Sequence, residues 1–169
     1  KNTLVILTSD NGPTPKADFN TLEKKGHDPS GILRGAKADS FEGGHRIPFI
    51  AKWPGKIKPG STSDETICLT DLMATAADVV DYKLPDSAGE DSVNILPVLR
   101  GKKYSKPLRE ATVHHSMNGS FAIRKGNWKL ILCPGSGGWS KPRPGKALLK
   151  GLPPIQLYDL EKDIKETNN

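Results

Sequence analysis

Cysteine and long apolar runs are scarce in this sequence. Its 169 residues include only Cys68 and Cys133, too few for a disulfide framework and too far apart for a paired Cys-x-x-Cys zinc motif. The longest aliphatic run covers residues 4–7, far short of the roughly 20 apolar residues that span a bilayer. We therefore expect no membrane span. The length suits one domain or half of a large one.

Acidic residues are the minority, with 19 Asp and Glu against 25 Lys and Arg, a net charge of +6. Residues 101–150 hold 11 basic residues and one acidic residue. Such a block either faces an anionic partner, such as a phosphate or sulfate ligand, or forms a solvated basic face. No nucleic-acid-binding module and no basic helical stripe is recognisable, so we expect no nucleic-acid partner.

Short apolar runs and one helical pattern favour an α/β fold in the first part of the chain. Residues 3–8 predict a strand buried on both faces of a parallel sheet, and residues 46–53 predict a second strand. Thr70 and Asp71 are suited to begin a helix. Its predicted core face carries Leu72, Met73, Ala76, Val79 and Val80.

The last part of the chain favours an antiparallel sheet. Residues 94–101 predict a short helix that glycine ends, and residues 121–132 predict a hairpin with a glycine turn. A last strand is expected at 156–160. We therefore predict two domains, 1–103 and 104–169. The chain begins at once with strand-type residues and ends after a charged stretch, so we expect it to be a piece of a longer chain.

Asp10 and Asn11 directly follow the first predicted strand. In open α/β sheets, ligands bind beyond the carboxyl ends of the strands. Carboxylate and amide oxygens suit a hard cation such as calcium, which takes six to eight oxygen ligands and so needs more than these two. The alternative is an ordinary Asx turn, because Asp-Asn-Gly-Pro is also a common loop sequence.

Two glycine-punctuated segments, residues 34–37 and 42–46, offer further polar groups. Glycine lets a backbone approach a ligand closely, and Lys37 can bring a point charge to an oxyanion. A lysine in such a loop is more often a surface lysine, however, and Glu42 and Arg46 fit a structural ion pair equally well. Three histidines are candidate acid, base or ligand groups: His45, His114 and His115. Neither cysteine has an activating setting, so both are interpreted as structural.

Taken in order, these segments resemble the second half of an arylsulfatase of the alkaline-phosphatase-like superfamily. The resemblance covers almost the whole chain. It rests on residues 8–13 (Thr-Ser-Asp-Asn-Gly-Pro), 33–37 (Leu-Arg-Gly-Ala-Lys), 41–48 (Phe-Glu-Gly-Gly-His-Arg-Ile-Pro), 53–55 (Trp-Pro-Gly), 70–72, 94–101, 122–131 and 157–160.

The resemblance implies a fold, an activity and a set of site residues. The fold is part of a large mixed sheet flanked by helices, plus a small subdomain with an antiparallel sheet and a helix. The activity is hydrolysis of sulfuric esters, in which a hydrated formylglycine attacks sulfur. Asp10 and Asn11 are then calcium ligands, Lys37 contacts the sulfate ester, and His115 is a further candidate for substrate contact. A periplasmic, extracellular or lysosomal location is favoured.

One part of the family pattern is missing from the sequence. Formylglycine arises from a Cys or Ser in a Cys/Ser-x-Pro/Ala-x-Arg motif, but Leu-Thr-Asp follows Cys68 and Pro-Gly-Ser follows Cys133. The resemblance places the nucleophile and the other calcium carboxylates in an N-terminal half. We therefore expect this chain to be inactive alone, and to self-associate through the exposed edge and apolar surface of its first strand.

Two alternatives stay open at this stage. The same superfamily scaffold serves phosphodiesterases and phosphonate hydrolases, which implies a phosphoryl rather than a sulfuryl ester. The chain could also be a non-catalytic module that holds a sulfated glycan with its basic block.

Overall fold

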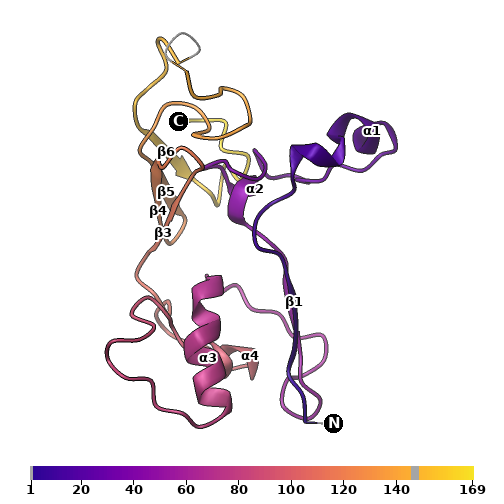
Figure 1. Cartoon of the computed structure of the whole chain (residues 1–169), viewed down its shortest axis with the longest axis vertical. Helices are drawn as coiled ribbons and strands as arrows, with labels where there is room; N and C mark the ends of the chain where they lie inside the picture. The colour runs from indigo at the N-terminus through magenta and orange to yellow at the C-terminus, as the bar shows by residue number, and fades with distance from the viewer. Residues whose placement is uncertain (1, 146–148) are drawn as a thin grey trace. The chain divides into compact units, whose positions relative to one another are not determined.

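The chain divides into two compact units, each described here by itself. The computed structural model describes residues 2–145 and 149–169 (Figure 1). The first unit joins the chain up to Thr8 with Phe49–Thr112, and the second joins Ser9–Pro48 with Val113–Asn169. The assignment of domains 1–103 and 104–169 stays a prediction.

A two-stranded sheet forms one part of the first unit. Strand β1 (Val5–Thr8) pairs antiparallel with β2 (Phe49–Lys52), so that Leu7 lies opposite Ile50. The two strands occur where predicted, but the expectation of a parallel sheet that buries both faces of β1 is wrong within the described residues. Val5 is 58% exposed and Leu7 63% exposed, so this face of β1 is not buried.

Short helices form the rest of the first unit. A 3-10 turn, η2 (Leu69–Asp71), leads into α3 (Leu72–Val79), and α4 (Leu96–Leu99) contacts α3. The predicted core face of α3 is wrong: the helix buries Thr75 and Ala77, while Met73 and Val80 are exposed. The hydroxyl of Thr75 explains its burial, since it donates to Asp71 O (2.6 Å) and accepts from Ile95 N (3.1 Å).

The second unit contains a four-stranded sheet in the order β3-β4-β5-β6. The strands are β3 (Thr112–His115), β4 (Phe121–Lys125), β5 (Trp128–Ile131) and β6 (Gln156–Asp159). The predicted hairpin is confirmed: β4 and β5 are antiparallel, with Lys125 opposite Trp128 across a two-residue turn. Gly126 in that turn has φ +57°, which glycine adopts without a steric cost.

One face of this sheet carries the core of the second unit. Alternate side chains point inward, and the core cluster consists of Phe41, Ala122, Ile131, Cys133, Tyr158 and Leu160. Phe41 is the N-cap residue of α2 (Glu42–His45), so the sheet buries the residue at which this short helix begins. The 3-10 turn η1 (Pro15–Ala17) and α1 (Phe19–Lys24) complete the unit and bury no residue.

Candidate functional site

The loop after β1, residues 9–13, holds Asp10 and Asn11 and is braced by hydrogen bonds from its own side chains to its backbone. Ser9 Oγ donates to Asn11 O (2.9 Å), and Asn11 Nδ2 donates to Gly12 O (2.9 Å). No hydrogen bond or ion pair involves the exposed Asp10 carboxylate among the described residues. The Asp10 carboxylate and the Asn11 amide oxygen thus remain available as hard oxygen ligands.

Glycines allow two loops, the Asp10 loop and the loop of residues 33–39, to lie directly against α2. Gly12 N donates to Gly44 O (2.9 Å), and a Cβ built on Gly12 would lie 1.7 Å from Gly43 O. A Cβ on Gly43 would lie 2.4 Å from Gly35 O, and Gly43 N donates to Arg34 O (2.7 Å). Backbones approach here more closely than any side chain permits, which explains the glycines at these positions.

Lys37 belongs to a second loop, residues 33–39, that lies beside the Asp10 loop. Its backbone N donates to Pro13 O (2.9 Å), which ties the two loops directly. The next residue, Ala38, has φ +83°, an uncommon conformation for a residue with a Cβ. The structure therefore brings the predicted residues Asp10, Asn11 and Lys37 onto adjoining loops, and it holds the Lys37 loop in a strained backbone.

Asp39 connects the Lys37 loop to the C-terminal part of the same unit. Its buried Oδ1 accepts from Trp139 N (2.7 Å) and Ser140 N (3.0 Å), and its Oδ2 accepts from Ala36 N (2.8 Å). Met117 N donates to Ala38 O (2.9 Å). The segments around residues 117 and 139 thus border the Lys37 loop.

His115 lies two residues before this contact but does not join it. The residue is exposed, and its ring packs edge-on against Phe121 with centroids 6.1 Å apart. Its Nδ1 lies 2.9 Å from Ser116 O. No contact between His115 and Lys37 occurs within the described part of the chain, so a substrate contact at His115 stays a prediction.

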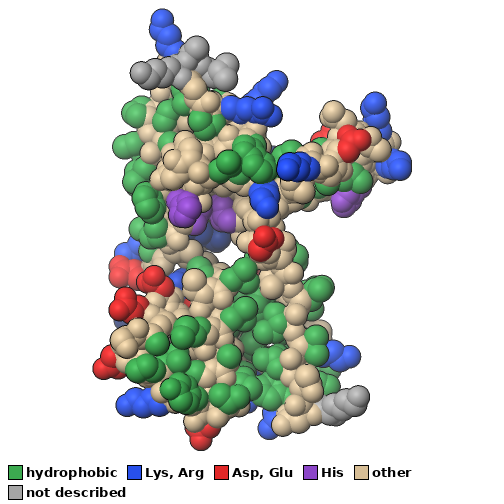
Figure 2. All heavy atoms as spheres, viewed as in Figure 1, with side chains coloured by type: hydrophobic (Ala, Val, Ile, Leu, Met, Phe, Trp, Pro, Cys, Tyr) green, Lys and Arg blue, Asp and Glu red, His purple; other side chains and the backbone are tan. Residues whose placement is uncertain are grey.

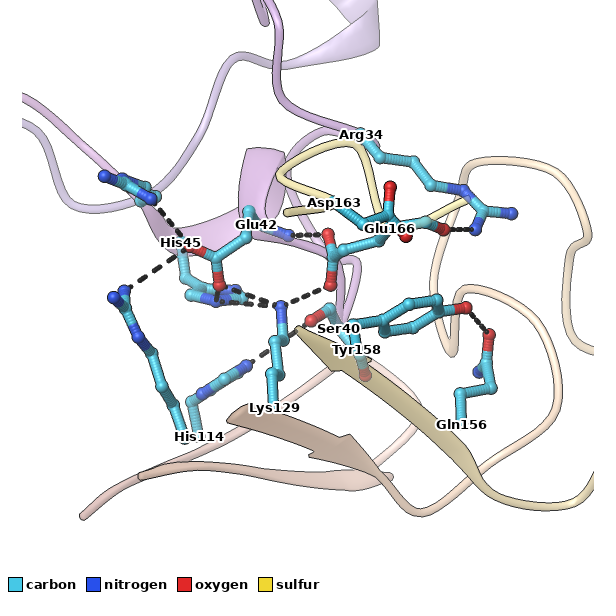
Figure 3. A network of polar contacts seen from close by, with 12 residues as sticks. Arg34, Ser40, Glu42, His45, His114, Lys129, Gln156, Tyr158, Asp163 and Glu166 are labelled. Carbon is cyan, nitrogen blue, oxygen red and sulfur yellow. Dashed lines mark hydrogen bonds and ion pairs between the residues drawn. The ribbon is translucent and has the colours of Figure 1, made fainter. Parts of the chain in front are cut away.

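A buried ionic network lies behind α2 (Figure 3). Lys129 Nζ lies 3.0 Å from Glu42 Oε1 and 2.9 Å from Glu166 Oε1, with all three side chains at most 2% exposed. Arg46 and Arg124 lie 3.4 and 3.7 Å from Glu42 Oε2. The predicted ion pair between Glu42 and Arg46 is therefore present, as one arm of a larger cluster.

The network shifts the pKa values of its members. Burial raises the pKa of Glu42, but the hydrogen bond with His45 and the charge of Lys129 outweigh it and hold that pKa well below its usual range. Burial raises the pKa of Glu166, against the opposing charge of Lys129. Glu42 therefore carries a negative charge at pH 7.

Two histidines lie beside this network rather than in the Asp10 and Lys37 loops. The rings of His45 and His114 lie 3.6 Å apart, and His45 Nε2 is 3.3 Å from Glu42 Oε1. Burial lowers the pKa of His45, and burial with the nearby His45 lowers the pKa of His114 to about 3. Both are therefore neutral at pH 7, which suits packing more than acid catalysis.

Sequence reasoning missed Asp39, Lys129 and Glu166. A signal for Lys129 exists, since it alternates with the buried Ile131 on β5 and so must point into the core. Asp39 and Glu166 carry no such signal, because the hydrogen bonds from Trp139 N to Asp39 and from Glu42 N to Glu166 join residues 100 and 124 positions apart in the chain.

The basic block at 101–150 does not act as one free cationic face. Lys129 is fully buried, Arg124 lies against Glu42, and Arg109 is paired with the buried Asp71. These cations neutralise partners inside the fold, which weakens the reading of the chain as a binding module for sulfated glycans.

Cys68 and Cys133 are both free cysteines. Cys133 is buried, and burial raises the pKa of Cys68, which keeps that thiol protonated. Among the residues that the structure describes, no group of three or more His, Cys, Asp or Glu side chains could hold a metal ion. No helix in residues 2–145 or 149–169 is long and apolar enough to cross a membrane.

Comparison with known proteins gives a consistent result. The family model described as Sulfatase matches residues 1–82. An N-acetylgalactosamine-6-O-sulfatase of Bacteroides thetaiotaomicron is 38% identical, over 99% of this chain and 32% of that protein. Arylsulfatase A of Homo sapiens is 34% identical, over 100% of this chain and 33% of that protein. The chain spans about a third of the length of these relatives.

Solved structures agree with the sequence comparisons. A protein from work on the metabolism of multiple glycosaminoglycans by Bacteroides thetaiotaomicron superposes with a TM-score of 0.81 at 37% identity, over 99% of this chain and 35% of that one. The predicted fold class, a C-terminal portion of an α/β fold with an antiparallel-sheet subdomain, is confirmed by this match.

Proposed function

Because this chain belongs to the sulfatase family and corresponds to the C-terminal part of its members, we propose that it forms one wall of a sulfuric ester hydrolase site. The observation that carries the proposal is the convergence of the Asp10 loop and the Lys37 loop. Gly12 N reaches Gly44 O, Gly43 N reaches Arg34 O, and Lys37 N reaches Pro13 O. Oxygen ligands and a cation thus share one small region.

Lys37 is proposed to contact the sulfate ester of the substrate. Its ammonium group offers up to three donors and a positive charge to the sulfuryl oxygens. That charge is most valuable as the S–O bond breaks, because negative charge then develops on the leaving oxygen. The hydrogen bond from Lys37 N to Pro13 O holds the loop in place before substrate binds.

Asp10 and Asn11 are proposed to supply part of a calcium site. Their carboxylate and amide oxygens fit a hard cation, and the Asp10 carboxylate is not engaged elsewhere among the described residues. A bound calcium ion supplies further positive charge for the sulfuryl group. Two ligands fall short of the six to eight that calcium takes, so the proposal places the others outside this chain.

The nucleophile is proposed to lie upstream as well. Neither Cys68 nor Cys133 stands in the sequence motif from which formylglycine is made. We therefore expect the chain alone not to hydrolyse a sulfate ester. Since one relative is named for N-acetylgalactosamine-6-O-sulfate, a sulfated glycan is the proposed substrate class. A periplasmic, extracellular or lysosomal location is part of the same proposal.

Reconstitution tests this function. The chain is fused to the upstream part of the 38% identical Bacteroides relative and expressed in a host that makes formylglycine. The folded fusion, checked by cooperative thermal unfolding, is assayed in calcium with a chromogenic aryl sulfate and the matching phosphate ester. We expect hydrolysis of the sulfate by the fusion and none by the chain alone.

Other outcomes have definite meanings. Preference for the phosphate ester points to a hydrolase of phosphoryl esters instead. A folded fusion that hydrolyses neither ester contradicts the proposal, as does sulfate hydrolysis by the chain alone.

A further inference from the structure

Lys129 is an unusual residue for the middle of a strand. Its side chain is fully buried, and its ammonium group contacts Glu42 Oε1 at 3.0 Å and Glu166 Oε1 at 2.9 Å. The two carboxylates come from α2 and from the C-terminal segment after β6 (Figure 3). One cation thus joins three segments that lie far apart in the sequence.

Stability alone does not explain such a cluster. Removing charges from water is costly, and replacing a buried ion pair with well-packed apolar side chains is often neutral or stabilising. Directional ionic contacts do, however, fix the position of the groups that make them. Lys129 and Glu166 are therefore best understood by asking what they hold in place.

They hold α2 from two sides. Glu166 Oε2 accepts from the backbone N of Glu42 (2.7 Å), while Lys129 holds the Glu42 side chain. The Glu166 backbone is itself fixed, because its carbonyl accepts from the Arg34 guanidinium, which lies over the Phe41 ring at 3.9 Å. The start of α2 has little freedom to shift.

The position of α2 in turn determines where the Asp10 loop and the Lys37 loop lie. Gly44 O accepts from Gly12 N, and Gly43 N donates to Arg34 O, without a side chain between the backbones. A shift of α2 by a fraction of an ångström therefore moves the Asp10 loop, the Lys37 loop or both.

We propose that Lys129 and Glu166 are positioning residues, which hold α2 so that the Asp10 and Lys37 loops keep the spacing that their ligands require. The importance of that spacing for catalysis rests on the proposed function. The structural link from Lys129 to the loops does not rest on the proposed function, and it can be tested without an activity assay.

Hydrogen exchange in the purified chain, followed by NMR for single amides, tests the link. The reporters are the amides of Gly12, Gly43 and Lys37, each of which donates across a loop contact. Reference amides are Leu132 and Leu160, which donate within the sheet region to Phe121 O and Asn127 O. In Lys129→Met we expect about tenfold faster exchange at the three reporters and little change at the references.

Two further variants complete the experiment. Glu166→Gln keeps an acceptor for Glu42 N but loses the charge, so we expect the same pattern with a smaller change; this variant decides the question if Lys129→Met does not fold. Lys165→Met removes an exposed lysine beside Glu166 and should leave all five amides unchanged.

Two results overturn the proposal. If reporters and references accelerate equally, the cluster stabilises the unit as a whole and positions nothing in particular. If neither set changes, Lys129 and Glu166 do not control the loops. Loss of sulfatase activity in the fusion, by contrast, would bear on the proposed function and not on this link.

Discussion

Single glycine positions decide how closely the loops of the candidate site approach α2. Gly43 lies in a short helix, where alanine is ordinarily better than glycine by about 1 kcal/mol. Here an added methyl group meets Gly35 O at 2.4 Å and Arg34 O at 2.6 Å, so the steric cost opposes the helix preference.

We expect Gly43→Ala to lower the free energy of unfolding by about 1–3 kcal/mol, the usual cost of overpacking. Urea denaturation followed by tryptophan fluorescence measures it. Gly119→Ala, in the same unit, adds a Cβ in open space at φ +82°, so it shows the cost of a left-handed backbone without a steric clash, a cost that Gly43 does not carry. A Gly43→Ala chain as stable as the wild type would show that the backbones are not in close contact.

His114 makes stability depend on pH. Its pKa is lowered to about 3 in the folded chain, by burial and by His45, against 6.5 for the free side chain. The unfolded chain therefore binds more protons between these values, and stability falls as pH falls from 6.5. One such group contributes at most about 1.4 kcal/mol per pH unit.

Urea unfolding of wild type and His114→Gln between pH 4.5 and 6.5 isolates this effect. His45 acts in the same direction and Glu166, with its raised pKa, in the opposite one, but both remain in the variant. We expect a shallower pH slope in His114→Gln and an unchanged slope in the exposed control His27→Gln. Equal slopes in all three chains would contradict the burial of a neutral His114.

At the scale of elements, Asp39 joins the Lys37 loop to the loop that contains Trp139. Its carboxylate accepts three backbone hydrogen bonds while buried. Asp39→Ala leaves three donors without this partner, and each lost hydrogen bond to a charged group costs about 1.5–3 kcal/mol before relaxation. We expect a loss of about 2–4 kcal/mol in unfolding free energy.

Thermal and urea unfolding compare Asp39→Ala with Asp86→Ala, which removes an exposed carboxylate. The control should lie within about 0.5 kcal/mol of the wild type. A small loss in Asp39→Ala would mean that water or neighbouring groups replace the carboxylate, and the two loops would then be only weakly joined.

Elements with local signals were predictable from the sequence. The β4–β5 hairpin follows from alternating side chains around a glycine turn, and α4 from an apolar run that glycine ends. The partner of β1 was not predictable, because a short apolar run fits parallel and antiparallel sheets equally well. The core face of α3 was missed because Thr75 is buried through hydrogen bonds that periodicity ignores.

The candidate site divides in the same way. Asp10, Asn11 and Lys37 are candidates from their place after a strand and among glycines and from the family resemblance. The structure puts their loops side by side, and their roles stay predictions. The residues that support those loops were not predicted from the sequence, because Lys129, Glu42 and Glu166 meet only through long-range packing.

At the scale of the whole chain, apolar side chains remain on the surface. Val5, Leu7 and Ile50 are each more than half exposed on the β1–β2 strand pair, and Figure 2 shows hydrophobic side chains gathered over this unit. Exposed apolar patches next to open strand edges promote association. We expect the isolated chain to self-associate as its concentration rises.

Sedimentation velocity over a range of concentrations tests this expectation. Leu7→Thr combined with Ile50→Thr should shift the chain toward the monomer, while Val80→Thr, which changes an exposed valine on the C-terminal end of α3, should not. A wild-type chain that stays monomeric throughout would contradict it.

The central claim is that this chain supplies the cationic wall of a sulfatase site through Lys37. The most direct measurement is kcat/KM for an aryl sulfate in the fused enzyme, with Lys37→Ala compared with Lys25→Ala, which changes an exposed lysine near α1. We predict a loss of about 100-fold or more in Lys37→Ala, the scale of losing one preorganised electrostatic contact, and none in the control. Equal activity in the two variants would contradict the claim.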